Sequence, residues 1–135
     1  MVVSTRGRYA LRVMIDLAEN QKDGYIPLKE IAERQDISQK YIESIMTILS
    51  KAKFVDAVHG KGGGYKLNRN PSDYKVKEIL EITEGDLAPV ACLECNAEKC
   101  EKEQNCRTIP MWRELNNLIN NYLGSVSIAD LAHLN

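Results

Sequence analysis

The chain has 135 residues, a formal net charge of −1, 44% apolar residues and four cysteines. This length suits one domain, or a small domain with an appendage. There is no apolar run long enough to cross a bilayer and no signal sequence at the start, so we expect a cytoplasmic protein without a membrane partner. No nucleophile and base pair, carboxylate pair or phosphate loop has usable spacing, so we do not expect an enzyme.

The charge is distributed unevenly along the chain. Residues 1–70 hold 12 Lys and Arg against 8 Asp and Glu, whereas residues 71–135 hold 6 against 11. The first half therefore carries +4 and the second half −5. A basic first half fits a polyanion partner such as nucleic acid, with the acidic half facing away from it.

A first helix is predicted from residue 4 or 5, where a hydroxyl side chain can cap it, to about Asn20. Three arginines near its start, Arg6, Arg8 and Arg12, oppose the helix macrodipole, which favours an external anion as their partner. A merely solvated surface is the alternative for any one of them. The apolar stripe expected to face the core is Ala10, Val13, Met14, Leu17 and Ala18.

Two further helices follow with a tight polar connection, which is typical of a helix-turn-helix motif. A turn at residues 23–24 and a brief edge strand at residues 25–26 precede Pro27, which is well placed to open a helix over residues 28–34. Ser38 suits the N-cap of the next helix, over about residues 39–52. The second helix is expected to bury Leu28, Ile31 and Ala32, and the third Tyr41, Ile45, Ile48, Leu49 and Ala52.

The polar residues at the start of the third helix are those that a recognition helix presents to base edges in a major groove. An ordinary solvated helix face is the alternative. Glu43 can accept a hydrogen bond from a cytosine amino group yet is repelled by phosphates, so it can discriminate between operators. Pairing with Lys40 or Lys51 is the alternative for Glu43. The residues expected to face the groove are Ser38, Gln39, Tyr41, Glu43 and Ser44.

Two short strands, residues 55–58 and 65–67, flank a tip with four glycines and nearby cations. A plain hairpin needs only two turn residues, whereas a bare backbone beside cations can approach a phosphate or enter a minor groove. A nucleotide-binding loop is disfavoured, because the tip lacks Walker spacing and opens no helix. The expected contacts in this wing are His59, Lys61, Gly62, Gly63 and Lys66, and the expected phosphate-neutralising cations are Arg6, Arg8, Lys40, Lys61 and Lys66.

The sequence therefore predicts a mainly α fold with a small β-hairpin wing, a winged helix-turn-helix, followed by a long C-terminal helix. A fourth helix, about residues 76–83, ends at Gly85, and the long helix, about residues 108–123, ends at Gly124. Ser127 and Asp130 form a capping-box-like start to a last helix over residues 128–133. The apolar face of the long helix is Ile109, Trp112, Leu115, Leu118, Ile119 and Tyr122.

One domain cannot easily bury so long an apolar face at its end, so we expect the long helix to pair with its counterpart in a second subunit. Packing across its own domain is the alternative. We divide the chain into a DNA-binding domain (1–85), a cysteine-rich sensor loop (86–107), and a dimerisation helix with a short C-terminal helix (108–135).

All four cysteines lie within fifteen residues, with the spacing Cys-x2-Cys-x4-Cys-x5-Cys. Clustered thiols of this kind suggest a soft metal or redox chemistry more than a structural disulfide. Zinc usually has two close cysteine pairs, whereas an iron-sulfur cluster accepts more irregular spacing. Direct thiol chemistry beside Lys99, Lys102 and Arg107 is a further alternative. The candidate ligands are Cys92, Cys95, Cys100 and Cys106.

Four motifs together resemble the Rrf-two family, the IscR, NsrR and CymR superfamily of bacterial transcription regulators. The resemblance covers essentially the whole chain. It implies a homodimeric repressor or dual regulator that binds a pseudo-palindromic double-stranded DNA operator. The motifs are Ser4-Thr5-Arg6-Gly7-Arg8-Tyr9-Ala10-Leu11, Ile37-Ser38-x-x-Tyr41-Ile42-Glu43, Gly60-x-Gly62-Gly63-Gly64-Tyr65 and Cys106-x-Thr108-x-x-x-Trp112.

The resemblance also implies an iron-sulfur cluster between the winged domain and the dimer helix, whose presence alters operator choice. Similar IscR-like members space three cysteines as Cys-x5-Cys-x5-Cys, with a histidine three residues past the last. This chain keeps Cys100-x5-Cys106 but has Glu94 at the first position and Ile109 at the histidine position. We therefore expect four thiolate ligands; the alternative is that only one of Cys92 and Cys95 binds and a residue from elsewhere completes the site. A two-iron two-sulfur cluster is favoured over a four-iron four-sulfur cluster, with zinc as the alternative metal.

Two alternatives follow for a chain that carries no cluster. CymR-like members of the same family sense through a protein partner, so such a partner is expected if no cluster is bound. A zinc-stabilised winged-helix adaptor that binds protein instead of DNA is the alternative from a different functional class.

Overall fold

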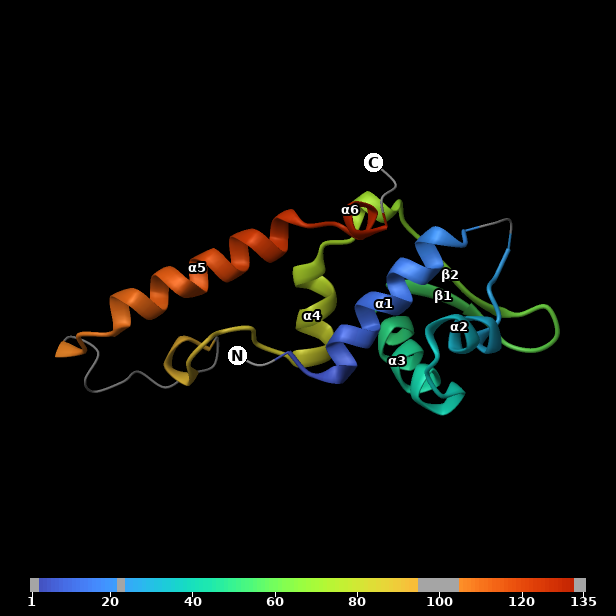
Figure 1. Ribbon diagram of the computed structural model, residues 1–135, viewed down its shortest axis with the longest axis horizontal. Coiled ribbons are helices and arrows are strands. Elements are labelled where there is room, and N and C mark those ends of the chain that lie inside the picture. Colours follow the sequence, from blue (N-terminus) through green and yellow to red (C-terminus); the bar gives the residue numbers. More distant parts are fainter. Residues whose placement is uncertain (1–2, 22–23, 95–104, 133–135) are drawn as a thin grey trace.

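The computed structural model describes residues 3–21, 24–94 and 105–132. The expectations for Cys95, Cys100 and residue 133 lie outside the described residues. The described chain is mainly helical with one small antiparallel hairpin, which confirms the predicted fold class (Figure 1). Its elements are α1 (Thr5–Glu19), α2 (Leu28–Gln35), α3 (Gln39–Lys51), β1 (Val55–Val58), β2 (Gly64–Leu67), η1 (Pro71–Asp73), α4 (Val76–Glu84), η2 (Ala91–Leu93), α5 (Ile109–Ser125) and α6 (Ile128–Leu131).

Helix α1 is the central helix of the winged head, the name used here for α1 to α4 with the hairpin. Ser4 caps it as predicted, because its Oγ accepts a hydrogen bond of 3.3 Å from the Gly7 N–H. All five residues of the predicted stripe are buried. Helices α2, α3, α4 and α6 all pack against α1, so it connects most elements of the head.

Helices α2 and α3 form the helix-turn-helix. Pro27 precedes α2, and Asp36 follows it in the left-handed conformation, with φ 54°, which turns the chain within three residues into α3. The Ser38 hydroxyl accepts a hydrogen bond of 3.2 Å from the Tyr41 N–H and caps α3 as predicted.

The buried face of α3 differs from the predicted one. Tyr41 and Ile48 are only half-buried, and Ile42 and Met46 are buried in their place. The helix contains three pairs of adjacent apolar residues, so its sequence allows two stripes about 100° apart, and packing against α1 selects one of them. The residues of α3 that are buried in the core are Ile42, Ile45, Met46 and Leu49.

The wing is a two-stranded hairpin whose register places Val55 opposite Leu67. Its second strand is fixed to the preceding segment by a bridge in which the Ile26 N–H donates to the Tyr65 carbonyl, 2.8 Å, and the Tyr65 N–H donates to the Ile26 carbonyl, 2.9 Å. Gly64 lies beside this bridge with φ 148°, and a Cβ at that position would collide with the Ile26 carbonyl. The bridge confirms the brief edge strand expected at residues 25–26.

Helix α5 extends away from the winged head (Figure 1). It continues through Gly124 to Ser125, so the prediction that Gly124 ends it was wrong. Glycine permits the left-handed turn that ends many helices but does not impose it, and Gly124 does not adopt that turn. Helix α6 begins with the predicted capping box between Ser127 and Asp130, but its last helical residue is Leu131.

The chain returns to the head after α5. The main core joins α1, α2, α3 and the hairpin to α6, whose Ile128 is fully buried. A smaller cluster packs Leu123 and Val126 at the end of α5 against Val76 and Leu80 of α4. The segment from Gly85 to the end of α5 is therefore attached to the head at both of its ends.

Candidate DNA-binding surface and cysteine segment

The start of α3 exposes the polar residues that were expected to face a DNA groove, namely Ser38, Gln39, Lys40, Glu43 and Ser44. Ser44 Oγ donates a hydrogen bond of 2.7 Å to the Tyr41 carbonyl, so the exposed Ser44 hydroxyl can still accept a hydrogen bond through its lone pairs. Tyr41 differs from the others, because its half-buried ring lies edge-on to the Tyr9 ring at 5.7 Å. Tyr41 therefore joins α3 to α1 as well as lying beside the polar surface.

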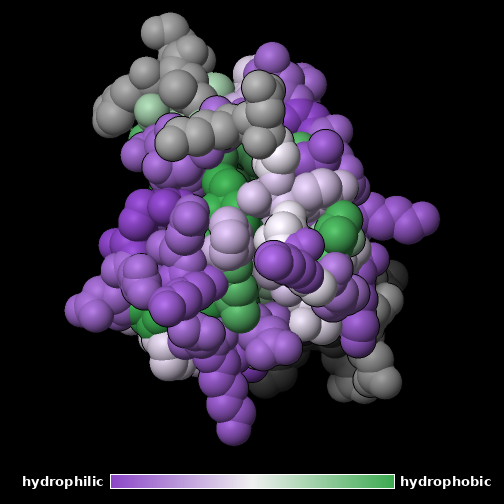
Figure 2. All heavy atoms as spheres, turned by 90° about the vertical axis from the view of Figure 1, so that its right-hand side faces the viewer, coloured by the Kyte–Doolittle hydropathy of each residue, from purple (hydrophilic) through white to green (hydrophobic). Residues whose placement is uncertain are grey.

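The wing and the recognition helix border one groove. This hollow of about 320 Å³ is lined by Glu43 from α3 together with His59, Gly60 and Gly63 from the wing. Burial and then the charge of Glu43 raise the pKa of Tyr65, another residue of this groove. Figure 2 faces this side of the molecule, and hydrophilic side chains cover most of it. The fold thus brings together Glu43 and wing residues that are at least sixteen positions apart in the sequence.

The expected phosphate-binding cations differ in their surroundings. Arg6, Arg8, Lys40 and Lys61 are exposed, and Arg8 also donates a hydrogen bond of 3.1 Å to the Thr5 hydroxyl. Lys66 is half-buried, and its ammonium lies over the Tyr25 ring, 4.9 Å from the ring centroid. An ammonium held against an aromatic face is less available to an external anion than the other four cations.

Arg12 has internal partners although it is exposed, so an external anion is not needed to explain this arginine, and the expectation of one stays a prediction. Its guanidinium donates to the Gln35 carbonyl, 2.6 Å, and to the Gln35 side chain, 3.1 Å. It also lies over the Tyr9 ring, 5.0 Å from the centroid. Because Tyr9 in turn contacts Tyr41, Arg12 helps to hold α1 against both helices of the DNA-binding motif.

An ion pair between α1 and α2, in which only the carboxylate is buried, was not predicted from the sequence. The Asp16 side chain is buried and accepts hydrogen bonds from Arg34 Nη2, 2.8 Å, and Arg34 Nε, 3.0 Å. Gln35 Nε2 also donates a hydrogen bond to Asp16, 2.8 Å. The hydrogen bond to Asp16 is the main cause of the raised pKa of Arg34. The available signal was an aspartate within a stripe of otherwise apolar residues, because a buried carboxylate requires a partner.

The cysteine segment, residues 86–107, connects α4 to α5, and the structure describes two of its four cysteines. Cys92 is exposed in η2, and Cys106 lies just before α5. The Cys106 Sγ lies 3.5 Å from the Thr108 Oγ1, and hydrogen bonds from the Thr108 side chain and from the Thr108 and Ile109 backbone lower the pKa of Cys106. These contacts favour the thiolate, which is the form that binds a metal.

The described residues near these cysteines include neither a histidine at the IscR-like position nor a complete group of metal ligands. Ile109 takes the position of the histidine in IscR-like members, and its apolar side chain is buried. Within residues 3–21, 24–94 and 105–132, no group of three or more His, Cys, Asp or Glu side chains is arranged to hold a metal ion. Two of the candidate ligands lie outside those ranges.

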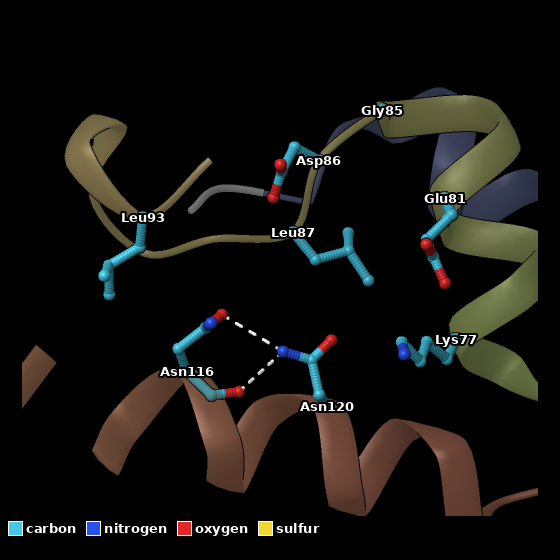
Figure 3. A pocket seen from close by; sticks show the side chains of 8 residues that line it. All are labelled: Lys77, Glu81, Gly85, Asp86, Leu87, Leu93, Asn116 and Asn120. Carbon is cyan, nitrogen blue, oxygen red and sulfur yellow. Dashed lines mark hydrogen bonds between the residues drawn. The ribbon is translucent and has the colours of Figure 1, made fainter. Parts of the chain in front are cut away.

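A polar hollow of about 410 Å³ separates the middle of α5 from α4 and from the start of the cysteine segment (Figure 3). Asn116 and Asn120 point into it from α5, and Leu87 and Leu93 border it from the segment. Asn120 Nδ2 donates to the Asn116 carbonyl, 2.8 Å, and to its side-chain oxygen, 3.1 Å. The contact between α5 and α4 is therefore concentrated at the C-terminal end of α5, in the small apolar cluster.

Helix α5 exposes large apolar side chains. Met111 is 53% exposed, Leu118 57% and Tyr122 68%, and Leu115 is exposed as well. Their spacing of three and four residues places them on one stripe of the helix. Ile109 is the one buried residue among those described in α5. Such a continuous apolar stripe is typical of a protein interface.

A helix-turn-helix with an exposed polar recognition helix and a glycine-tipped wing defines the class of winged helix-turn-helix DNA-binding proteins. No helix among the described residues has the length and apolar character needed to span a membrane. The family model Rrf2, described as an iron-dependent transcriptional regulator, matches residues 3–134. The chain belongs to this family, named Rrf-two above, and is a DNA-binding transcriptional regulator.

Relatives and solved structures agree with this assignment. The HTH-type transcriptional regulator IscR of Xenorhabdus nematophila is 35% identical over 131 residues, which cover 97% of this chain and 79% of that protein. The structure of CymR (YrzC), the global cysteine regulator of B. subtilis, has a TM-score of 0.81 at 30% identity and covers 100% of this chain and 98% of that one. The structure of T. potens IscR has a TM-score of 0.72 at 34% identity, with coverages of 97% and 85%.

These similarities confirm the expected family and fold. Because Rrf2 proteins are transcriptional regulators, they also confirm that the chain is not an enzyme.

Proposed function

We propose that this regulator binds a pseudo-palindromic operator as a homodimer and that an iron-sulfur cluster on the cysteine segment modulates its affinity. The observation that carries this proposal is that the cysteine segment is the direct connection between the winged head and the exposed apolar stripe of α5. A change in that segment can therefore alter how two heads are held relative to each other. The protein would act in the cytoplasm, where its operator lies.

On the DNA side, the recognition helix would lie in a major groove and the wing tip beside it. The exposed cations Arg6, Arg8, Lys40 and Lys61 would neutralise phosphates, with Lys66 contributing less because of its contact with Tyr25. Base contacts would come from Ser38, Gln39, Glu43 and Ser44, with Tyr41 supporting them and His59, Gly62 and Gly63 approaching the backbone.

The stripe of Met111, Leu115, Leu118 and Tyr122 supports the homodimer, because two copies of α5 can bury it against each other. A two-fold dimer matches a pseudo-palindromic operator whose half-sites lie about one DNA turn apart. The winged head, the cysteine segment and the dimerisation helix would then act as three successive functional regions, 1–85, 86–107 and 108–135.

The residues proposed to hold the cluster are Cys92, Cys95, Cys100 and Cys106. Their chemistry fits, because clusters are held by thiolates and the surroundings of Cys106 favour its thiolate. When bound, such a cluster supplies sensitivity to iron supply or to oxidants. The description of the family as iron-dependent supports iron over zinc, and we favour the two-iron two-sulfur form.

Direct oxidation of cysteine is a second candidate, favoured by one observation. Hydrogen bonds from Thr108 favour the Cys106 thiolate, and a thiolate is the form that oxidants attack. A structure of Staphylococcus aureus CymR is described as an oxidised form. In this alternative no metal is bound, and the input is an oxidant or a protein partner.

The test is to purify the protein without oxygen, record its visible spectrum and measure iron, sulfide and zinc. Iron and sulfide in matching amounts with charge-transfer bands would support the cluster, one zinc per chain would favour a structural site, and a metal-free chain would favour thiol chemistry. Operator affinity is then compared between loaded and cluster-free protein at fixed salt. A difference of roughly tenfold is expected from typical coupling free energies, and equal affinities would contradict modulation.

A further inference from the structure

The start of α1 is held by a residue from the end of another helix. The Ser4 backbone N–H donates a hydrogen bond of 3.0 Å to the Glu84 Oε1, and the Ser4 hydroxyl donates to the same oxygen. Glu84 is the last residue of α4 and lies 80 positions away in the sequence. Ser4 thus accepts from Gly7 within its own helix while it donates to Glu84, so one carboxylate joins two helix ends.

The charges at these two ends are unfavourable for each helix taken alone. The first turn of α1 has no acidic residue and carries Arg6 and Arg8, although the positive end of a helix dipole favours anions. The last turn of α4 has no basic residue and ends with Glu84, although the negative end favours cations. Because the two helix ends lie together, the Glu84 carboxylate supplies the negative charge that the start of α1 lacks.

Space for this carboxylate is created by Gly7. Gly7 is buried, and a Cβ at that position would overlap the Glu84 carboxylate. With no Cβ, Gly7 leaves the room beside the first turn of α1 that the Glu84 carboxylate occupies.

We propose that Glu84 is a positioning residue for DNA binding: it fixes the first turn of α1 through Ser4, so that Arg6 and Arg8 are held where phosphates lie. This inference rests on the proposed phosphate contacts of those two arginines. The conformation of two long cationic side chains depends on the backbone that carries them, and here that backbone is anchored to α4. Loss of the anchor would let the first turn fray and would disperse the two charges.

The experiment measures binding of the full chain to a fluorescein-labelled duplex of mixed sequence, about 30 base pairs long, by anisotropy at several salt concentrations. Non-specific binding reports phosphate contacts, so no operator is needed. The variants are Glu84→Ala and Glu84→Gln, with Glu81→Ala as the matched control, because Glu81 is an exposed carboxylate one turn earlier on α4.

For Glu84→Ala, the expected change in DNA affinity is opposite to the change that simple electrostatics predicts. Removing a negative charge should strengthen binding to a polyanion, so Glu81→Ala should bind equally or slightly more tightly. Glu84→Ala should instead bind about three- to tenfold more weakly, as expected for loss of a helix cap, with Glu84→Gln between it and the wild type. If Glu84→Ala binds as tightly as Glu81→Ala, the proposal is overturned.

A second readout separates positioning from a general loss of stability. If Arg6 and Arg8 lose their phosphates, the plot of log affinity against log salt becomes shallower by up to about 0.9 per contact. Thermal unfolding followed by circular dichroism shows whether each variant is folded at the assay temperature, and Glu84→Gln replaces Glu84→Ala if the latter is not. An unchanged salt slope in a folded, weaker-binding variant would contradict the proposal.

The double variant Arg6→Gln/Arg8→Gln distinguishes this proposal from the phosphate contacts on which it rests. A shallower slope in the double variant together with a wild-type slope in the Glu84 variants would overturn the positioning role alone. A wild-type slope in the double variant would show that these arginines do not contact phosphates, which would remove the basis for the positioning role as well.

Discussion

The winged head and helix α5 use similar amphipathic sequences in different ways. In the head, the apolar faces of α1, α3 and α4 are buried against one another, and even the carboxylate of Asp16 is hydrogen-bonded, by Arg34 and Gln35. In α5, the apolar stripe leaves four large side chains exposed. The comparison teaches that periodicity predicts an apolar face but does not specify whether the same chain or a second chain covers it.

The first prediction breaks the function of α5 and leaves the head intact. Leu118→Glu places a charge in the middle of the exposed stripe, so we expect a monomer in sedimentation and at least about 100-fold weaker operator binding, because the advantage of two linked heads is lost. Asn121→Glu, on an exposed position of the same helix outside the stripe, is the control and should remain dimeric. A dimeric Leu118→Glu protein would refute the proposed interface.

The second prediction breaks the head and leaves α5 intact. Arg34→Met removes the partner of Asp16, whose side chain is 1% exposed, and should lower the free energy of unfolding by roughly 3 kcal/mol. Asp16→Asn should cost less, about 1–2 kcal/mol, because Arg34 remains 34% exposed and can be solvated. Urea unfolding of both variants checks which one loses more free energy of unfolding. Equal losses would mean that burial of Asp16 is not the dominant cost.

The third prediction concerns the surface of the head, where neither folding nor assembly should change. Glu43→Ala should alter the ranking of operator variants, with individual affinities changing by about tenfold or less, because a carboxylate distinguishes a cytosine amino group from other base edges. Glu33→Ala, an exposed carboxylate on α2, is the control. An unchanged ranking across a set of operator variants would show that Glu43 does not discriminate.

The smallest effect is expected at the junction of the cysteine segment and α5. In cluster-free protein with the other three cysteines replaced by serine, alkylation of Cys106 should have its midpoint below the ordinary pKa of a thiol, because hydrogen bonds favour the thiolate. Thr108→Val removes the largest of these contributions, so the midpoint should move upward toward the ordinary value. Identical pH profiles for the two proteins would show that Thr108 does not control this thiol.

Most of the head, and the start of α6, were predictable from local sequence signals. Ser4, Ser38 and Ser127 cap the helices at the expected positions, and both strands of the wing were expected from β-branched residues around a glycine tip. These features depend on neighbours within a few residues. The predicted end of α5 at Gly124 was wrong, because a glycine permits the turn that ends a helix but does not impose it.

What escaped prediction depends on contacts between distant parts of the chain. The buried face of α3 was chosen by its neighbours, and the partners Asp16 and Arg34 are 18 positions apart. The groove beside Glu43 required the wing to fold back onto α3, although Glu43, His59 and Gly63 were each expected to contact DNA. The roles of the predicted DNA contacts and cysteine ligands stay predictions until the experiments above are made.

The position of α6 has a consequence for the order in which the chain folds. Ile128 and Ala132 belong to the same core as α1 and the hairpin, although the intervening helix α5 lies outside it. During synthesis, the DNA-binding part therefore cannot complete its core until α6 has left the ribosome. A long-range closure of this kind slows folding, and it also delays a finished DNA-binding surface until the cysteine segment and the dimerisation helix have been made.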